Sequence, residues 1–149
     1  MIGDFFAKLL LGTGRLKPEL HAVLDSEGLV IIEEGLPGAV RYRRFKAPGR
    51  RFHGKVTLER IALAISDQRL AVYCRSGRAK LIDAAFSDPR LSAVEVSLRN
   101  NDTVSIQVDY DRMDVPSVSG EIAITARTPK AASIVEHLQA RLGRTESPS

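Results

Sequence analysis

Short apolar segments separated by turn-forming residues dominate the chain between His21 and Arg127. In two of them, Val94–Leu98 and Val104–Val108, apolar side chains alternate with polar ones. Such alternation predicts strands with one buried face, and the Asn-Asn-Asp sequence at 100–102 predicts the turn that joins them as a hairpin. In all we expect about seven to nine strands, with the spacing typical of all-β sandwiches and barrels.

The other expected strands are bounded by Gly, Pro, Asn, Asp or Ser, the residues that favour turns. They cover residues 21–25, 29–32, 39–46, 56–66, 69–74, 78–86 and a last segment ending near 126. Turns are expected at 26–28, 36–38 and 47–49. Within 56–66 the apolar phase slips near Glu59, and a bulge or bend there would reconcile the two halves.

Two helices are predicted, one near each end of the chain. At the C-terminal end Thr128 can act as N-cap, Pro129 suits the first helical position and Gly143 follows the last turn. Its apolar stripe comprises Ala131, Ile134, Val135, Leu138 and Leu142. Near the N-terminus Asp4 can cap a short helix through Leu11. The exposed apolar face of that helix would comprise Phe5, Phe6, Leu9 and Leu10.

The short N-terminal helix has two interpretations. We favour packing of its apolar face against the main domain or against a second copy of the chain, which makes it a candidate self-association face. Insertion into a membrane surface is the alternative, but two turns with Lys8 as the single cation make a weak anchor.

Composition places the chain among soluble globular domains of ordinary size. It has 149 residues, of which 44% are hydrophobic and 27% charged. Cys74 is the single cysteine, so no internal disulfide can form, and its apolar neighbours favour a buried, inert side chain. The sequence has neither a signal-peptide pattern nor an apolar stretch long enough for a transmembrane segment. We therefore expect a cytoplasmic location.

One long sheet with a single amphipathic C-terminal helix predicts a mainly β fold, in which the helix closes the open end of a strongly bent sheet. The segment Ile61–Tyr73, IALAISDQRLAVY, resembles a hairpin of the bacterial pleckstrin-homology-like proteins, which are related to PH and GRAM domains. The resemblance covers about residues 20–143. It implies a half-open barrel of about seven antiparallel strands closed by a C-terminal helix. Residues 1–19 would then be the short helix and linker, and 144–149 a disordered tail.

The same resemblance implies a non-catalytic binding module. Inositol-phosphate binders of the family carry a Lys, a gap and then Lys/Arg-x-Arg across the first hairpin. Here Lys46 matches the Lys and Arg51 the first Arg, but His53 replaces the final Arg. This departure puts phosphoinositide recognition in doubt.

The most unusual segment is residues 41–55, RYRRFKAPGRRFHGK, which holds seven Lys or Arg and no acid. Removing those seven charges from the net charge of +4 leaves −3 for the rest, so the molecule is strongly polarised. Such a cluster attracts polyanions, and arginine forks suit phosphate and carboxylate. The candidate anion- or partner-binding residues are Arg41, Arg43, Arg44, Lys46, Arg50, Arg51, His53 and Lys55.

A different interpretation is that the segment is merely solvated, its arginines paired with acids such as Glu33, Glu34 or Glu59. If it is functional, the first hypothesis is an acidic phospholipid surface at the inner face of the membrane or an acidic patch on a protein. The second is a protein-interaction or self-assembly scaffold, with a homo-oligomer as one form. Nucleic-acid binding and a small-ligand carrier rank below both.

Three aromatic residues of the same segment bear on whether nucleic acid is a partner. Tyr42, Phe45 and Phe52 interleave the cations, which suits stacking on single strands. Rings that face the core are the commoner reason for such a pattern, and no RNA-binding signature is present. Nucleic acid is therefore an unlikely partner on sequence grounds.

Motifs for catalysis or metal binding are absent from the sequence. The three histidines, His21, His53 and His137, are scattered without ligand spacing. The carboxylates of Asp109, Asp111 and Asp114 lack the Gly and the distal Glu of a calcium loop. With no nucleophile elbow or phosphate loop either, we expect a protein that is not an enzyme and uses no metal or cofactor.

Overall fold

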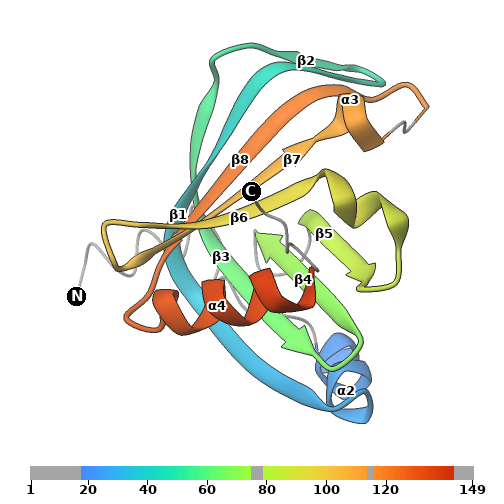
Figure 1. Ribbon diagram of the computed structural model, residues 1–149. Helices are drawn as coiled ribbons and strands as arrows, with labels where there is room; N and C mark the ends of the chain where they lie inside the picture. Colours follow the sequence, from blue (N-terminus) through green and yellow to red (C-terminus); the bar gives the residue numbers. More distant parts are fainter. Residues whose placement is uncertain (1–17, 75–78, 114–115, 143–149) are drawn as a thin grey trace. The chain divides into compact units, whose positions relative to one another are not determined.

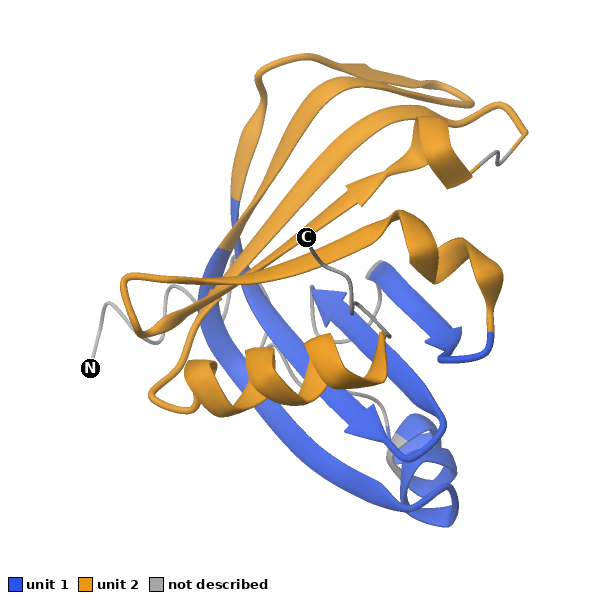
Figure 2. Ribbon diagram, viewed as in Figure 1, with its two compact units in different colours: residues 1–38, 58–87 blue, residues 39–57, 88–149 orange. Residues whose placement is uncertain are grey.

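The computed structural model describes residues 18–74, 79–113 and 116–142, and the chain divides into two compact units. Unit 1 comprises residues 1–38 and 58–87, and unit 2 comprises residues 39–57 and 88–149 (Figure 2). Each unit is therefore assembled from two separate stretches of sequence. The predicted helix at 4–11 lies outside the described residues.

Eight strands make up one sheet in the described part of the chain (Figure 1). They are β1 (Leu29–Ala47), β2 (Arg50–Phe52), β3 (Val56–Ser66), β4 (Arg69–Cys74), β5 (Ala79–Ala85), β6 (Val94–Arg99), β7 (Thr103–Asp109) and β8 (Ser119–Arg127). The order is β5-β4-β3-β1-β8-β7-β6, and β2 pairs with β1. The helices are α2 (Pro18–Ser26), α3 (Tyr110–Met113) and α4 (Ala131–Arg141), with a 3₁₀ turn at Pro89–Ala93.

The expected fold class is confirmed. The protein is mainly β, with antiparallel strands, a C-terminal helix and a short helix, α2, near the N-terminal end.

In unit 1 the centre of the sheet is buried on both faces. β3 and β4 pair in regular register from Ile61↔Cys74 to Ile65↔Leu70, and residues 61–66 are all buried. On one face α2 places Leu24, which is fully buried, against the small side chains of Ala62 and Ala64. Alanines at these positions let the helix lie close to the strands.

A charged network joins the end of α2 to β4 and β5. The Arg69 guanidinium donates two hydrogen bonds to Glu27, at 2.9 and 2.6 Å, and one to Asp83 at 2.8 Å. The hydroxyl of Tyr73 donates to the other oxygen of Asp83 at 2.6 Å. The hydrogen bond from Arg69 lowers the pKa of Glu27, and burial together with the bond to Asp83 raises that of Tyr73.

In unit 2 three strands and one helix enclose a core. β6, β7 and β8 form an antiparallel meander in which Val94 lies opposite Val108, and Val108 opposite Ile122. α4 packs against β6 and β7 (Figure 1) and buries Ile134 and Leu138 there. The even-numbered residues of β7 and β8 face this core, so the odd-numbered ones form the opposite, polar face of the sheet.

Most predicted elements are present. The 94–108 hairpin has the three-residue loop expected of Asn-Asn-Asp, with positive φ at Asn100 and Asn101. The C-terminal helix begins at Ala131, two residues later than predicted, and the Thr128 hydroxyl accepts a hydrogen bond from the Lys130 amide. The buried residues of β3 lie in its second half, and Val56 and Leu58 at its start are exposed. The bulge or bend expected near Glu59 stays a prediction.

Two local predictions were wrong. Residues 21–25, expected as a strand, belong to α2, because Leu20 and Leu24, one helical turn apart, both pack on the alanine face of unit 1. The turn expected at 36–38 is instead the interior of β1. The irregularity lies at Gly35, which has φ +69° and whose carbonyl accepts a hydrogen bond from Arg60. The strand continues through Pro37.

Candidate functional site

The basic segment forms the β1–β2 hairpin of unit 2. Phe45 pairs with Phe52, Lys46 with Arg51 and Ala47 with Arg50, which leaves Pro48 and Gly49 as a two-residue turn. Pro followed by a Gly of positive φ, here +73°, is the pattern of a type II turn. The turn predicted at 47–49 is therefore confirmed, and it brings three cations to one tip.

At this tip like charges lie directly opposite each other. Lys46 and Arg51 are cross-strand partners, Arg50 is the next residue, and all three side chains are exposed. They line an open hollow together with Ser117. Like charges in register destabilise a hairpin. Within the described part of the chain no acid lies within ion-pair distance of the three, so nothing there offsets the repulsion.

An aromatic cluster, Tyr42, Phe45, Phe52 and Tyr110, anchors the base of the hairpin. Ring centroids lie 5.3 Å apart for Tyr42 and Phe45, 5.0 Å for Tyr42 and Phe52, and 5.7 Å for Phe45 and Tyr110. Burial raises the pKa of Tyr110. Because the rings pack on one another, their presence among the cations has a structural explanation.

Lys55 also contacts the aromatic cluster, through the ring of Phe52. Its ammonium lies 4.1 Å from the centroid of the Phe52 ring, within the range of a cation–π contact. This cation is thus held over the aromatic base of the hairpin.

Along β1, side chains point alternately to the two faces of the sheet, and this alternation is shifted by one residue at Arg44. Tyr42 and Phe45 contact each other although they are three residues apart, and Arg44 between them has φ +50°. Its amide donates to Nδ1 of His53 at 3.2 Å. The shift places the rings on one face and directs Arg43 and Arg44 together toward Glu121 on β8.

The ion pairs of these two arginines are weak. The distances to the Glu121 carboxylate are 3.8 Å from Arg43 and 3.9 Å from Arg44, whose side chains are 60% and 65% exposed. Long, exposed pairs contribute little. Both arginines are therefore paired with an acid, as expected if the segment is merely solvated, and that acid is Glu121 on β8.

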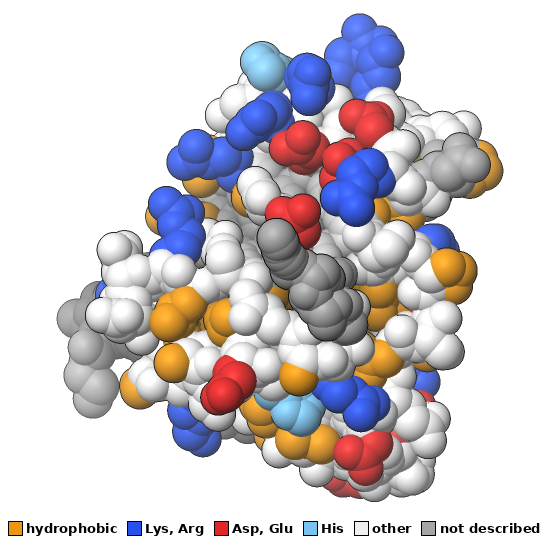
Figure 3. All heavy atoms as spheres, in the orientation of Figure 1, with side chains coloured by type: hydrophobic (Ala, Val, Ile, Leu, Met, Phe, Trp, Pro, Cys, Tyr) orange, Lys and Arg blue, Asp and Glu red, His pale blue; other side chains and the backbone are white. Residues whose placement is uncertain are grey.

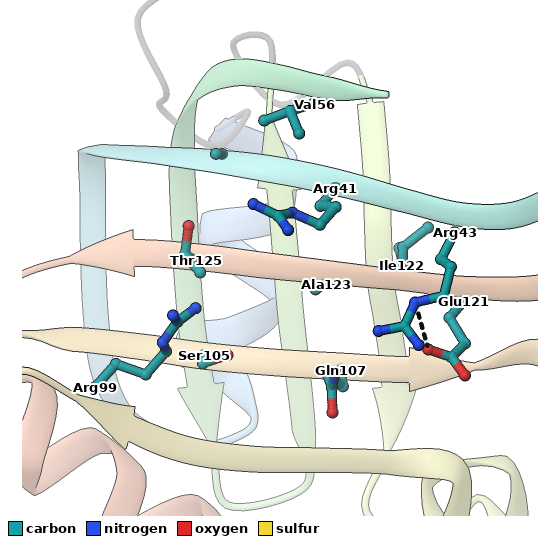
Figure 4. Close-up of a pocket in the computed structure, with 11 residues that line it drawn as sticks. Arg41, Arg43, Val56, Arg99, Ser105, Gln107, Glu121, Ile122, Ala123 and Thr125 are labelled. Atoms are coloured by element: carbon teal, nitrogen blue, oxygen red, sulfur yellow. Dashed lines mark ion pairs between the residues drawn. The ribbon is translucent and has the colours of Figure 1, made fainter. Parts of the chain in front are cut away.

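A second feature is a cavity of about 260 Å³ on the polar face of unit 2 (Figure 4). Its lining comes from strands β1, β7 and β8, the end of β6 and the start of β3. The polar lining residues are Arg41, Arg43, Arg99, Ser105, Gln107, Glu121 and Thr125. Ser105 and Thr125 are cross-strand partners, so their side chains lie next to each other.

The structure thus divides the predicted residues between two places. Lys46, Arg50 and Arg51 surround the tip of the hairpin, whereas Arg41 and Arg43 line the cavity. Figure 3 shows Lys and Arg gathered over the region where Figure 1 labels β2. The candidate self-association face, Phe5, Phe6, Leu9 and Leu10, lies outside the described residues.

Sequence analysis missed Arg99, Ser105 and Thr125. The available signal was their odd-numbered position on β6, β7 and β8, which places them on the polar face. Only the strand order β1-β8-β7-β6 shows that this face also receives Arg41.

Asp109 and Asp111 have structural roles, whereas Asp114 lies outside the described residues. Asp109 accepts a hydrogen bond from the Asp111 amide, and Asp111 accepts one from Gly120, so both carboxylates hold the chain around α3. Cys74 is 3% exposed. Among the residues that the structure describes, no three His, Cys, Asp or Glu side chains are grouped closely enough to hold a metal.

Comparison with known proteins adds no assignment. Neither a protein-family model nor a curated protein matches the chain. Within the described ranges, none of the helices has the length and apolar character that crossing a bilayer requires. The case for a function therefore depends on the geometry of unit 2.

Proposed function

We propose that this protein is a non-catalytic, PH-like binding module whose β1–β2 hairpin engages an anionic phospholipid surface. The observation that carries the proposal is the cross-strand pair Lys46–Arg51 beside Arg50. Two exposed cations lie directly opposite each other, a third is adjacent, and no acid within the described ranges offsets them. Residues that break a local rule of stability are most often functional, and an anionic surface would relieve this repulsion.

Electrostatics makes such an interaction strong enough to matter. Each Lys or Arg near an anionic leaflet contributes about 1 kcal/mol. The three cations of the tip would supply about 3 kcal/mol, and the weakly paired Arg43 and Arg44 would add to the field. The tip presents its charges on a rigid two-residue turn anchored by the aromatic cluster, so little ordering is needed on binding.

Vesicle co-sedimentation tests the proposal. The full chain is mixed with phosphatidylcholine vesicles that contain or lack phosphatidylglycerol. We expect binding only to the acidic vesicles, and a loss of at least about 30-fold for the double variant Arg50→Glu/Arg51→Glu, since two contributions of about 1 kcal/mol disappear. The expected loss requires that the variant remain folded, which circular dichroism checks.

A matched variant separates position from total charge. Lys80→Glu/Arg127→Glu makes the same change in net charge at exposed positions that are not part of the hairpin. It should bind acidic vesicles nearly as well as the wild type. Equal losses in both variants would show that net charge alone drives binding, and no binding by the wild type would contradict a lipid partner.

A further inference from the structure

The cavity on the polar face of unit 2 has the composition of an anion site. It contains Arg41 from β1 and Arg99 from the end of β6, two cations 58 positions apart in the sequence. Figure 4 shows both guanidinium groups on the same side of the sheet, with Thr125 between them. Neither guanidinium group has an ion pair or hydrogen bond to another residue that the structure describes.

The charge of the lining is positive. Three arginines and one carboxylate, that of Glu121, give the cavity a formal charge of +2. Glu121 is already shared between Arg43 and Arg44, so it does not neutralise Arg41 or Arg99. Two unpaired arginines facing one hollow repel each other, and a bound anion removes that repulsion.

The neutral lining residues add hydrogen-bond donors. The hydroxyls of Ser105 and Thr125 are adjacent across the β7–β8 pair, and the amide of Gln107 lies two residues further along β7. With the guanidinium forks these groups offer more donors than one carboxylate can accept. A phosphate monoester has three terminal oxygens and about −1.5 to −2 charges at neutral pH, which match the donors and the charge.

The remaining lining limits the rest of the ligand. Its apolar members are Ala39, Val56, Ile122 and Ala123, so no aromatic side chain is present to stack a base. The volume of about 260 Å³ is below the roughly 300–1,000 Å³ of pockets for drug-sized ligands. These limits favour a small, non-aromatic ester.

We infer that this cavity binds the phosphate monoester of a small aliphatic molecule through Arg41 and Arg99. The phosphate is either that of a soluble ester or that of a lipid headgroup. The site does not depend on the proposed function, because the hairpin tip contributes none of its lining.

Isothermal titration calorimetry with glycerol 3-phosphate tests the soluble source on the full chain. We expect binding that Arg41→Gln and Arg99→Gln each weaken about tenfold or more, because each removes a charged fork. Arg99→Lys, which keeps the charge but lacks the fork, should restore only part of the affinity. Arg127→Gln serves as the matched control, since Arg127 does not line the cavity.

Vesicles test the lipid source. Phosphatidic acid carries a phosphate monoester and phosphatidylglycerol a diester. If the ligand is a headgroup, the protein should prefer phosphatidic acid, and Arg99→Gln should remove the preference. Amide chemical shifts of Ser105 and Thr125 then locate either ligand in the cavity.

Each outcome has a defined meaning. Binding of the soluble ester, or a preference for phosphatidic acid, supports the site when it requires Arg41 and Arg99. Absence of both, or affinities that neither substitution changes, overturns it. The hairpin variant Arg50→Glu/Arg51→Glu should still bind glycerol 3-phosphate, so failure of this site and failure of the proposed function are distinguishable.

Discussion

At the scale of single residues, Gly120 occupies a tightly constrained position in unit 2. Its φ is +90°, and a Cβ added there would overlap the backbone carbonyl of Arg44. The close approach holds the start of β8 against the point where the alternation of β1 shifts. A side chain at this position meets both backbone strain and a clash that no rotamer relieves.

We therefore predict that Gly120→Ala lowers the free energy of unfolding by about 3 kcal/mol or more. Gly49→Ala is the matched control, because Gly49 also has a positive φ but its Cβ would meet open space. It should cost only about 1 kcal/mol. Urea denaturation of the two variants measures the difference, and equal losses would mean that the close approach is absent in solution.

Also at this scale, Arg69 is the cationic partner of two carboxylates, those of Glu27 and Asp83. The side chains of Glu27 and Asp83 are each 15% exposed, so their charges depend on it. We predict that Arg69→Gln costs about 2 kcal/mol at neutral pH, less than for a fully buried pair because Arg69 is 27% exposed. The control is Arg90→Gln, whose pair with Asp88 lies at the surface and should matter little.

The network also predicts a dependence on pH. The pKa of Glu27 is lower in the folded chain than its ordinary value of 4.5, because Arg69 and Ser66 donate to its ionised form. Glu27 therefore stabilises the fold above about pH 4.5, and this contribution is lost as the pH falls through the lowered value. In Arg69→Gln the decrease in unfolding free energy from neutral to acidic pH should be smaller. An identical decrease in both proteins would contradict the assignment.

At the scale of elements, the aromatic cluster determines whether the hairpin is ordered. Phe45 is 9% exposed and contacts Tyr42, Phe52 and Tyr110. We predict that Phe45→Ala costs about 3 kcal/mol in unfolding free energy and weakens binding to acidic vesicles, because the tip loses its rigid base. Tyr110→Phe keeps the ring and should change neither measurement much. If Phe45→Ala loses stability but still binds acidic vesicles fully, the aromatic cluster does not contribute to vesicle binding.

Elements were predictable where the signal was local. The hairpin at 94–108 and the Pro48–Gly49 turn depend on alternation and turn chemistry that any short window shows. The helical conformation of residues 21–25 could not be predicted in this way, because a five-residue apolar run fits a strand as well as a helix. Near Pro37 the course of β1 involves contacts between distant positions, such as the hydrogen bond from Arg60 to Gly35, 25 residues apart, which no short window shows.

At the scale of the whole molecule, charge is the dominant feature. Seven cations lie in one segment and the rest of the chain carries a net −3. We predict that binding to acidic vesicles falls more than tenfold when the salt concentration rises from about 0.1 M to about 1 M, because the Debye length shrinks from about 10 to about 3 Å. Co-sedimentation at both concentrations measures this. Binding that salt leaves unchanged would indicate apolar insertion instead.

Only part of the candidate site could be predicted from the sequence, because only part of it lies within one segment. The sequence of residues 41–55 by itself groups these cations around one predicted turn. The cavity requires Arg41 to meet Arg99 and Thr125, and their proximity follows from strand order and register. A motif within one segment is visible in sequence, whereas a site built across β1, β8, β7 and β6 is not.

The one-residue shift at Arg44 has a consequence for sequence change in this chain. Because the shift adds one residue between Tyr42 and Phe45, deletion of Arg44 would restore regular alternation and keep both rings on one face. Only Arg43 would then face Glu121. Among natural variants, loss of one residue here should therefore preserve the aromatic cluster and reduce the charge beside Glu121.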